Sequence, residues 1–196
     1  ETDKAEMAGQ IVLAPPSALN DRWSRRLPDP GAAMGSGWVG GRQRPFGPAA
    51  DAYLRVIDTL CEDADAMLHV GCALHSLRAV PPDAMRAVLD ALPPSMPVHI
   101  HIAEQIGEVQ DSLALRNARP VEWLLANANV DSRWTLVHAT HLTPGETQGI
   151  ARSGATVAIC PTTEANLGDG LFPLRDYPDA GGRWGIGSDS HISVSP

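Results

Sequence analysis

Residues 97–160, PVHIHIAEQIGEVQDSLALRNARPVEWLLANANVDSRWTLVHATHLTPGETQGIARSGATVAIC, decide the fold of this chain. Three short apolar runs within them have the length of buried strands: residues 97–103, 134–138 and 156–160. The segments between these runs are long enough for helices, and hairpin turns are missing where antiparallel pairing would need them. The pattern therefore predicts parallel strands joined by right-handed helical crossovers.

The intervening segments carry helical signals. Residues 108–117 and 121–127 are predicted to be helical. Thr143, Pro144 and Glu146 stand at the N-cap, first and third positions of a later helix, which is a capping box with proline at its favoured place. Gly154 stands where that helix should end.

The same alternation extends to both sides of this stretch. Apolar residues recur at three- and four-residue steps between residues 49 and 61, which is typical of an amphipathic helix. A strand at 67–74 and a helix at 81–92 follow, and a last strand is predicted at 183–187. Five strands in this arrangement define the α/β class. A doubly wound sheet and a piece of an eight-stranded β/α barrel both fit.

The first 48 residues have a different character, because glycine and proline interrupt every apolar run before it reaches the length of a helix or strand. We predict an irregular Gly/Pro-rich segment over residues 1–48 and an α/β domain over residues 49–196. Whether residues 9–48 fold is left open by the sequence.

Composition excludes several classes of function. The 196 residues carry a formal charge of -8, with 43% apolar residues, which is typical of a soluble globular protein. The acidic balance argues against nucleic-acid or membrane-surface partners. The sequence has neither a membrane span nor a signal-peptide pattern, so a cytoplasmic location is expected. The three cysteines lie far apart, which disfavours a thiolate zinc site.

Chemically active side chains gather at the predicted strand ends, where β/α proteins keep their reactive groups. Five of the seven histidines fall at or just past such an end, although core folding does not require this distribution. Since parallel strands present their carboxyl ends at one edge of the sheet, these side chains are expected to lie close together there. The side chains at these ends are, in chain order, His75, Arg78, His101, Glu104, His138, His141, Cys160, Thr162, Asp189 and His191.

Imidazole nitrogens and a carboxylate oxygen are the usual ligands of a catalytic zinc ion. His101, His138 and Asp189 are therefore the candidate ligands of one divalent metal ion. His99 faces the same way as His101 and is a weaker candidate. A single strand histidine is more often a hydrogen-bonded core residue, and it is the joint placement of these residues that favours a metal.

Two further side chains have both a functional and a plain interpretation. Glu104 lies three residues after His101, where it could carry a proton to a leaving group or be a solvated loop carboxylate. Arg78 could clamp a substrate carboxylate or be a surface charge, and its uncharged neighbours favour the clamp.

Six motifs stand at or near the predicted strand ends: HSLRAV (75–80), HIHIAEQ (99–105), RPVEWLL (119–125), LVHATHLT (136–143), CPTTEANLGDGLFP (160–173) and GIGSDSHIS (185–193). Together they resemble one family, the formiminoglutamate deiminases of the amidohydrolase superfamily. The resemblance covers about residues 68–196, and HSLRAV combined with TTEANLGDG is its most specific part.

The resemblance implies a metal-dependent TIM-type β/α barrel, of which this chain holds about strands 4 to 8. The HxH metal pair of the family's first strand has no counterpart before residue 49. A barrel takes about 250 residues, so the ring would need further polypeptide or a partner chain to close. This chain alone is expected to have little or no activity.

The resemblance also implies the reaction, which is hydrolysis of N-formimino-L-glutamate to N-formyl-L-glutamate and ammonia in histidine degradation. It implies one zinc ion held by His101, His138 and Asp189, and it implies that His99 is not a ligand. Asp189 would take a proton from the attacking water and Glu104 would carry it to the departing nitrogen. His138 would also orient the attacking oxygen.

The same resemblance implies two substrate contacts, with His75 near the formimino end and Arg78 on a glutamate carboxylate. A small molecule with carboxylates is thus the expected partner, and a homodimer stays open. Two alternatives remain: another amidohydrolase that deaminates a ring substrate, which has less use for Arg78, and a non-catalytic metal-binding fragment.

Overall fold

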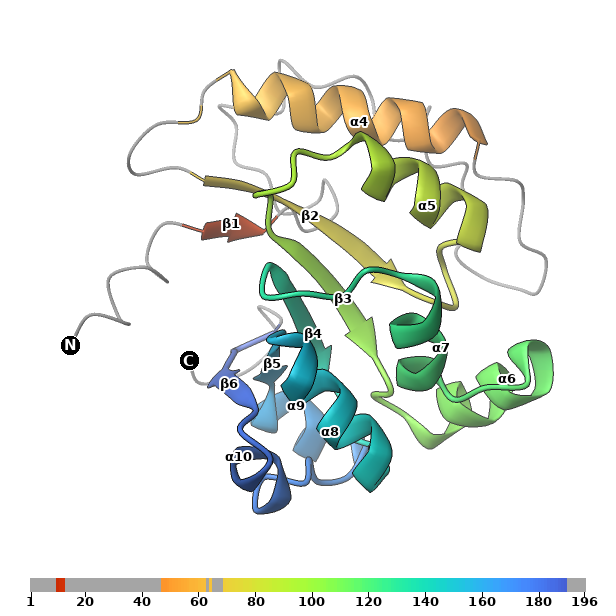
Figure 1. Cartoon of the computed structure of the whole chain (residues 1–196), viewed down its shortest axis with the longest axis vertical. Coiled ribbons are helices and arrows are strands. Elements are labelled where there is room, and N and C mark those ends of the chain that lie inside the picture. Colours follow the sequence, from red (N-terminus) through yellow and green to blue (C-terminus); the bar gives the residue numbers. More distant parts are fainter. Residues whose placement is uncertain (1–9, 13–46, 63, 65–68, 190–196) are drawn as a thin grey trace. The chain divides into compact units, whose positions relative to one another are not determined.

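The computed structural model describes residues 10–12, 47–62, 64 and 69–189, whose helices and strands are labelled in Figure 1. These residues belong to two compact units. The first unit comprises the chain up to Leu74 together with Ala79–Val98, and the second comprises His75–Arg78 and the chain from His99 onward.

The first unit is built around the first part of strand β2, which spans His69–Ser76. A three-residue strand, β1 (Gln10–Val12), pairs with β2 in parallel. Helix α4 (Gly47–Cys61) is fixed to β2 by the hydroxyl of Tyr53, which donates to Ala73 O at 3.1 Å and accepts from Ala73 N at 2.9 Å. Helix α5 (Pro82–Ala91) packs against α4.

The second unit holds parallel strands in the order β3-β4-β5-β6. Helices follow each of the first three strands, and β6 follows the short helix α10. The strands are β3 (Val98–Ile102), β4 (Trp134–His138), β5 (Thr156–Ile159) and β6 (Arg183–Ile186). The helices are α6 (Ile106–Arg116), α7 (Pro120–Asn127), α8 (Pro144–Ser153), α9 (Pro161–Leu167) and α10 (Asp176–Asp179).

Strand β3 shows how the sheet divides its residues between two faces. Val98, Ile100 and Ile102 are fully buried, whereas the alternating residues His99 and His101 are half-buried on the other face. Burial of such β-branched side chains contributes about 1.5–3 kcal/mol each. The apolar face thus fixes β3, and the opposite face is left for the histidines.

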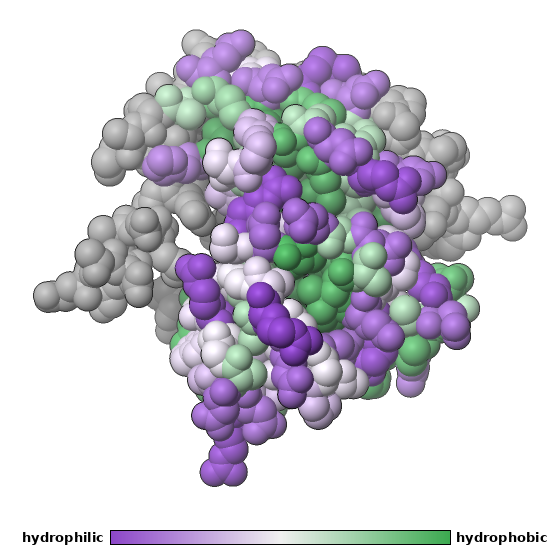
Figure 2. Space-filling view, in the orientation of Figure 1, coloured by the Kyte–Doolittle hydropathy of each residue, from purple (hydrophilic) through white to green (hydrophobic). Residues whose placement is uncertain are grey.

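The surface of the molecule in the orientation of Figure 1 carries hydrophilic and hydrophobic residues interspersed (Figure 2). Single exposed apolar side chains in the second unit, such as Leu115 and Leu171, are ordinary for a folded domain. Among the residues described, the helices are too short or too polar to cross a bilayer.

The predicted helix with a capping box is confirmed in detail. Thr143 Oγ1 accepts the backbone N–H of Glu146 at 3.2 Å, and Glu146 Oε2 accepts the N–H of Thr143 at 2.8 Å. Gly154 ends α8 with φ of 79°, a left-handed conformation that glycine adopts without strain. The other predicted strands and helices also form, with ends shifted by a few residues.

Three short elements differ from the sequence-based expectation. Residues 161–167, for which no helix was predicted, form α9, and α10 was not predicted either. Strand β1 lies within residues 1–48, where irregular structure was predicted, and α4 begins at Gly47. The rest of that segment lies outside the described residues. These elements are too short to show a hydrophobic period, so the pattern gave no signal for them.

A partly buried ion pair joins the N-terminal ends of α7 and α8 in the second unit. Arg119 Nε donates to Glu146 Oε2 at 2.8 Å, and Arg119 Nη2 donates to His141 O at 2.6 Å. Glu146 is 4% exposed, so Arg119→Met leaves a buried carboxylate short of a partner. We expect urea unfolding to show a loss of about 2–4 kcal/mol.

The matched control for this ion pair is Arg152→Met. Arg152 is exposed and makes one long contact, at 3.5 Å, with Gln148. Its loss should change the free energy of unfolding by less than about 0.5 kcal/mol. Equal effects of the two variants would show that the Arg119–Glu146 pair does not stabilise the unit.

Candidate active site

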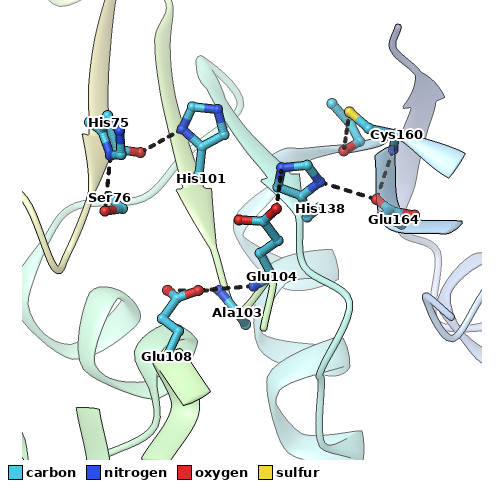
Figure 3. Close-up of polar contacts among 10 residues, drawn as sticks. His75, Ser76, His101, Ala103, Glu104, Glu108, His138, Cys160 and Glu164 are labelled. Atoms are coloured by element: carbon cyan, nitrogen blue, oxygen red, sulfur yellow. Dashed lines mark hydrogen bonds and ion pairs between the residues drawn. The ribbon is translucent and has the colours of Figure 1, made fainter. Parts of the chain in front are cut away.

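Donor atoms from three strand ends of the second unit converge. His101, His138 and Asp189 each offer one ligand atom, and these atoms lie within 4.8 Å of one another. The rings of His101 and His138 are stacked with centroids 5.6 Å apart, and the ring of His75 lies 5.4 Å from that of His101. Figure 3 shows the three imidazoles in a row along the ends of β2, β3 and β4.

Hydrogen bonds fix which ring nitrogen of each histidine faces the cluster. His101 Nδ1 lies 2.8 Å from the backbone oxygen of His75, and His138 Nδ1 lies 3.2 Å from Glu164 Oε1. Both partners are acceptors, so each Nδ1 carries the proton and donates. The Nε2 lone pairs of His101 and His138 are therefore available to a cation. Two such nitrogens and a carboxylate fit a divalent metal ion with open positions.

The backbone is strained at the same edge. Five residues other than glycine adopt left-handed conformations at or just past the strand ends, and such conformations cost about 1–3 kcal/mol each. Strain of this kind concentrates at functional sites. The residues and their φ angles are His75 (39°), Ala103 (50°), His138 (68°), Ala139 (49°) and Asp189 (64°).

Glu104 lies beside the cluster, on a loop whose backbone is bonded by the carboxylate of Glu108. Glu104 Oε1 is 3.7 Å from His138 Nε2. The buried carboxylate of Glu108 accepts the backbone N–H groups of Ala103 and Glu104, each at 3.0 Å. Burial raises the pKa of the Glu104 carboxyl above its usual range, partly opposed by His138. A positioned carboxyl of raised pKa can carry a proton.

His75 and Arg78 lie together at the end of β2. Burial lowers the pKa of His75, and the charges of His101 and Arg78 lower it further, so this imidazole is neutral at pH 7. Arg78 is exposed on the turn after β2. That turn is fixed by Arg116, whose Nη2 donates to Leu77 O at 2.7 Å.

A second group of possible ligands shares His138 with the first and includes Cys160 and Glu164. Burial raises the pKa of the Cys160 thiol to about 12, with Asp189 and Glu164 adding to the effect, so the thiol keeps its proton. Cys160 Sγ donates to Ala158 O at 3.9 Å. In this second group the carboxylate of Glu164 already accepts from His138 Nδ1 and from the backbone N–H of Cys160. The group with His101 and Asp189 is therefore the better candidate.

The remaining histidines have other surroundings. Among the described residues, His99 belongs to neither ligand group, and its buried Nε2 has no hydrogen-bond partner. His141 lies past β4 and likewise has a buried Nε2 without a partner in this part of the chain. His191 lies outside the described residues.

Burial lowers the pKa of His99 from 6.5 to about 4, with a smaller effect from His101. The unfolded chain therefore takes up a proton near pH 6.5 that the folded chain accepts only near pH 4. The free energy of unfolding should rise with pH between about 4 and 6.5. As the pH falls through this window, the contribution of His99 to stability is lost. His99→Leu should flatten this dependence on pH when the free energy of unfolding is measured by urea titration. His69→Leu, which replaces an exposed histidine, is the control and should leave the dependence unchanged. An unchanged pH dependence in His99→Leu would contradict the lowered pKa of His99.

Sequence reasoning missed two buried carboxylates that hold the site. Glu108 and Glu164 are 3% exposed and bond the backbone just past β3 and β5. Each stands in the first turn of the helix that follows its strand. An acidic residue at that place is the available signal, but it is also what an ordinary helix start shows.

Comparison with known proteins agrees with this fold. The model of the Amidohydrolase family matches residues 27–195. The chain belongs to the amidohydrolase family, whose members depend on a metal. It is 51% identical over 154 residues to the formimidoylglutamate deiminase of Pseudomonas aeruginosa, covering 78% of this chain and 34% of that protein. It is 30% identical over 131 residues to a 5-methylthioadenosine/S-adenosylhomocysteine deaminase of Natronomonas pharaonis, and this match covers 66% of this chain and 30% of that protein.

Two solved structures resemble the chain over 76% of its length. An amidohydrolase from Brucella melitensis is 46% identical with a TM-score of 0.66, and 35% of it is covered. An adenosine deaminase from Xanthomonas campestris, with bound zinc, is 28% identical with a TM-score of 0.68, and 34% of it is covered. The chain thus spans about a third of the length of these relatives. The predicted family and the predicted partial β/α barrel are confirmed.

Proposed function

We propose that the protein containing this chain hydrolyses N-formimino-L-glutamate to N-formyl-L-glutamate and ammonia. The observation that carries the proposal is the convergence of His101, His138 and Asp189 beside Glu104, in a chain that is 51% identical to a formimidoylglutamate deiminase over most of its length. Hydrolysis of a C=N bond needs a positioned water, a base and a proton carrier, and this edge offers groups for each.

His101 and His138, through Nε2, and Asp189 would hold a single zinc ion. When bound, such an ion lowers the pKa of water and polarises the C=N group. Zinc is supported by the nitrogen and oxygen donor set and by the zinc in the Xanthomonas campestris relative.

Three side chains of this chain divide the proton transfers. Asp189 accepts a proton from the attacking water as the new C–O bond forms. Glu104 carries this proton to the imine nitrogen and then transfers the proton of the new hydroxyl to the same nitrogen. The C=O bond of the formyl group forms as the C–N bond breaks, and ammonia leaves. His138 orients the attacking oxygen. The raised pKa of the Glu104 carboxyl suits it to hold a proton between the two steps.

The substrate is held by the end of β2. His75, neutral at pH 7, contacts the formimino end, and Arg78 binds a glutamate carboxylate. A guanidinium binds a carboxylate through two parallel N–H bonds, and this geometry selects for the acid group. A homodimer and a cytoplasmic location also remain predictions.

A ring deaminase is the second candidate function, favoured by the 30% identity to a 5-methylthioadenosine/S-adenosylhomocysteine deaminase. Arg78 argues against it, because a purine ring has no carboxylate for a guanidinium to bind.

Ammonia release distinguishes these candidates. We expect the full-length protein containing this chain to release ammonia from N-formimino-L-glutamate and to turn over 5-methylthioadenosine at least about 100-fold less efficiently. Chelation should remove the activity and zinc should restore it. The reverse preference would favour the ring deaminase, and zinc binding without turnover of either compound would favour a non-catalytic metal-binding module.

A further inference from the structure

Glu164 lies behind His138, on the side away from Glu104 (Figure 3). We propose that Glu164 is a positioning residue that fixes the proton of His138 on Nδ1 and thereby directs the lone pair of Nε2 toward the candidate metal group. The inference rests on the proposed function only in taking His138 as a functional group.

One carboxylate oxygen of Glu164 makes both contacts. Oε1 accepts from His138 Nδ1 at 3.2 Å and from the backbone N–H of Cys160 at 2.8 Å. Glu164 is 3% exposed and His138 is 1% exposed, so water does not replace either bond. The loop after β5 and the ring at the end of β4 are therefore tied to the same atom.

The chemistry of the carboxylate decides the tautomer. An ionised carboxylate only accepts hydrogen bonds, so a neutral His138 next to it must carry its proton on Nδ1. A free imidazole has no such constraint and can hold the proton on either nitrogen. With the proton on Nδ1, the lone pair of Nε2 lies on the side of Glu104, whose Oε1 is 3.7 Å away.

The fold supplies Glu164 through α9, a short helix that was not predicted from the sequence. Pro161 begins this helix and Cys160 is its N-cap, which places Glu164 in the first turn. A negative charge is favoured at a helix N-terminus by the backbone dipole. Helix α9 thus carries a carboxylate to a point where β4 ends.

The proposal predicts a measurable effect on metal binding. Partners that orient a ligating histidine typically change metal affinity by about 10–100-fold. In the metal-free full-length protein, we expect nitrogen-15 NMR to show His138 with its proton on Nδ1. Glu164→Leu should remove this preference and weaken Zn²⁺ binding, measured by competition with a chelator, by about 10–100-fold.

Glu164→Gln keeps an acceptor oxygen at the same place but removes the charge. This variant should keep the Nδ1 proton and lose less Zn²⁺ affinity than Glu164→Leu, because hydrogen bonds to charged acceptors are about twice as strong as neutral ones. The matched control is Glu146→Leu, which removes an equally buried carboxylate that bonds Arg119 instead of a histidine. It should lower stability and leave the His138 signals and the Zn²⁺ affinity unchanged.

Wild-type tautomer and affinity in Glu164→Leu would overturn the proposal, as would the same loss of affinity in Glu146→Leu. If Glu164→Leu does not fold, Glu164→Gln decides, and a wild-type Zn²⁺ affinity in it would overturn the proposal. Neither measurement needs substrate. A failure to release ammonia from formiminoglutamate therefore counts against the proposed function and leaves this inference standing.

Discussion

Asp189→Asn should abolish ammonia release and lower the zinc content of the purified protein. Asp189 is the one carboxylate of the candidate metal group, and an amide oxygen is a weaker ligand than a carboxylate oxygen. The amide also cannot accept the proton of the attacking water. Loss of a general base alone costs about 10²–10⁴-fold in kcat, and loss of metal adds to it.

The left-handed backbone at Asp189, with φ of 64°, makes asparagine the appropriate replacement. Asparagine tolerates this conformation about as well as aspartate, so the fold should not change. Asp179→Asn, at an exposed aspartate of α10, is the matched control and should keep both activity and zinc. Turnover retained by Asp189→Asn would remove Asp189 from the mechanism.

Arg78→Ala should raise KM steeply with a smaller change in kcat. The turn that carries Arg78 is held by the bond from Arg116 to Leu77 O, at 2.7 Å, so the guanidinium is presented from a fixed backbone. A hydrogen bond to a charged group contributes about 1.5–3 kcal/mol, which corresponds to a factor of about 10–150 in KM. Steady-state kinetics with N-formimino-L-glutamate measures this factor.

Two further variants test whether shape or charge matters at Arg78. Arg78→Lys keeps the charge but loses the planar fork, so it should recover only part of the lost binding. Arg86→Ala removes an exposed arginine of α5 that pairs with Asp83 and should leave KM unchanged. Unchanged kinetics in Arg78→Ala would discard the clamp.

The sequence predicted the parts of the site that depend on strand ends. His101 and His138 follow apolar runs whose ends could be located to within a residue, and parallel strands present those ends at one edge. Composition and spacing alone left a doubly wound sheet and a barrel open. The family resemblance decided between them.

The sequence could not predict the partners of these histidines. The Nδ1 bonds to His75 O and to Glu164 depend on where a carbonyl and a helix come to lie after the chain has turned. Glu164 is four residues from Cys160, in a helix of two turns that shows no hydrophobic period. Such contacts follow from tertiary placement, which local patterns do not encode.

The left-handed residues at the strand ends indicate which part of the protein should lose its native conformation first on heating. Five of them, at about 1–3 kcal/mol each, represent a free-energy cost comparable with the whole net stability of a typical domain. The buried strands and capped helices offset this cost. If their packing weakens, the ligand edge is the first part of the unit to gain by relaxing, so heat should inactivate the enzyme at temperatures where most of its backbone is still folded.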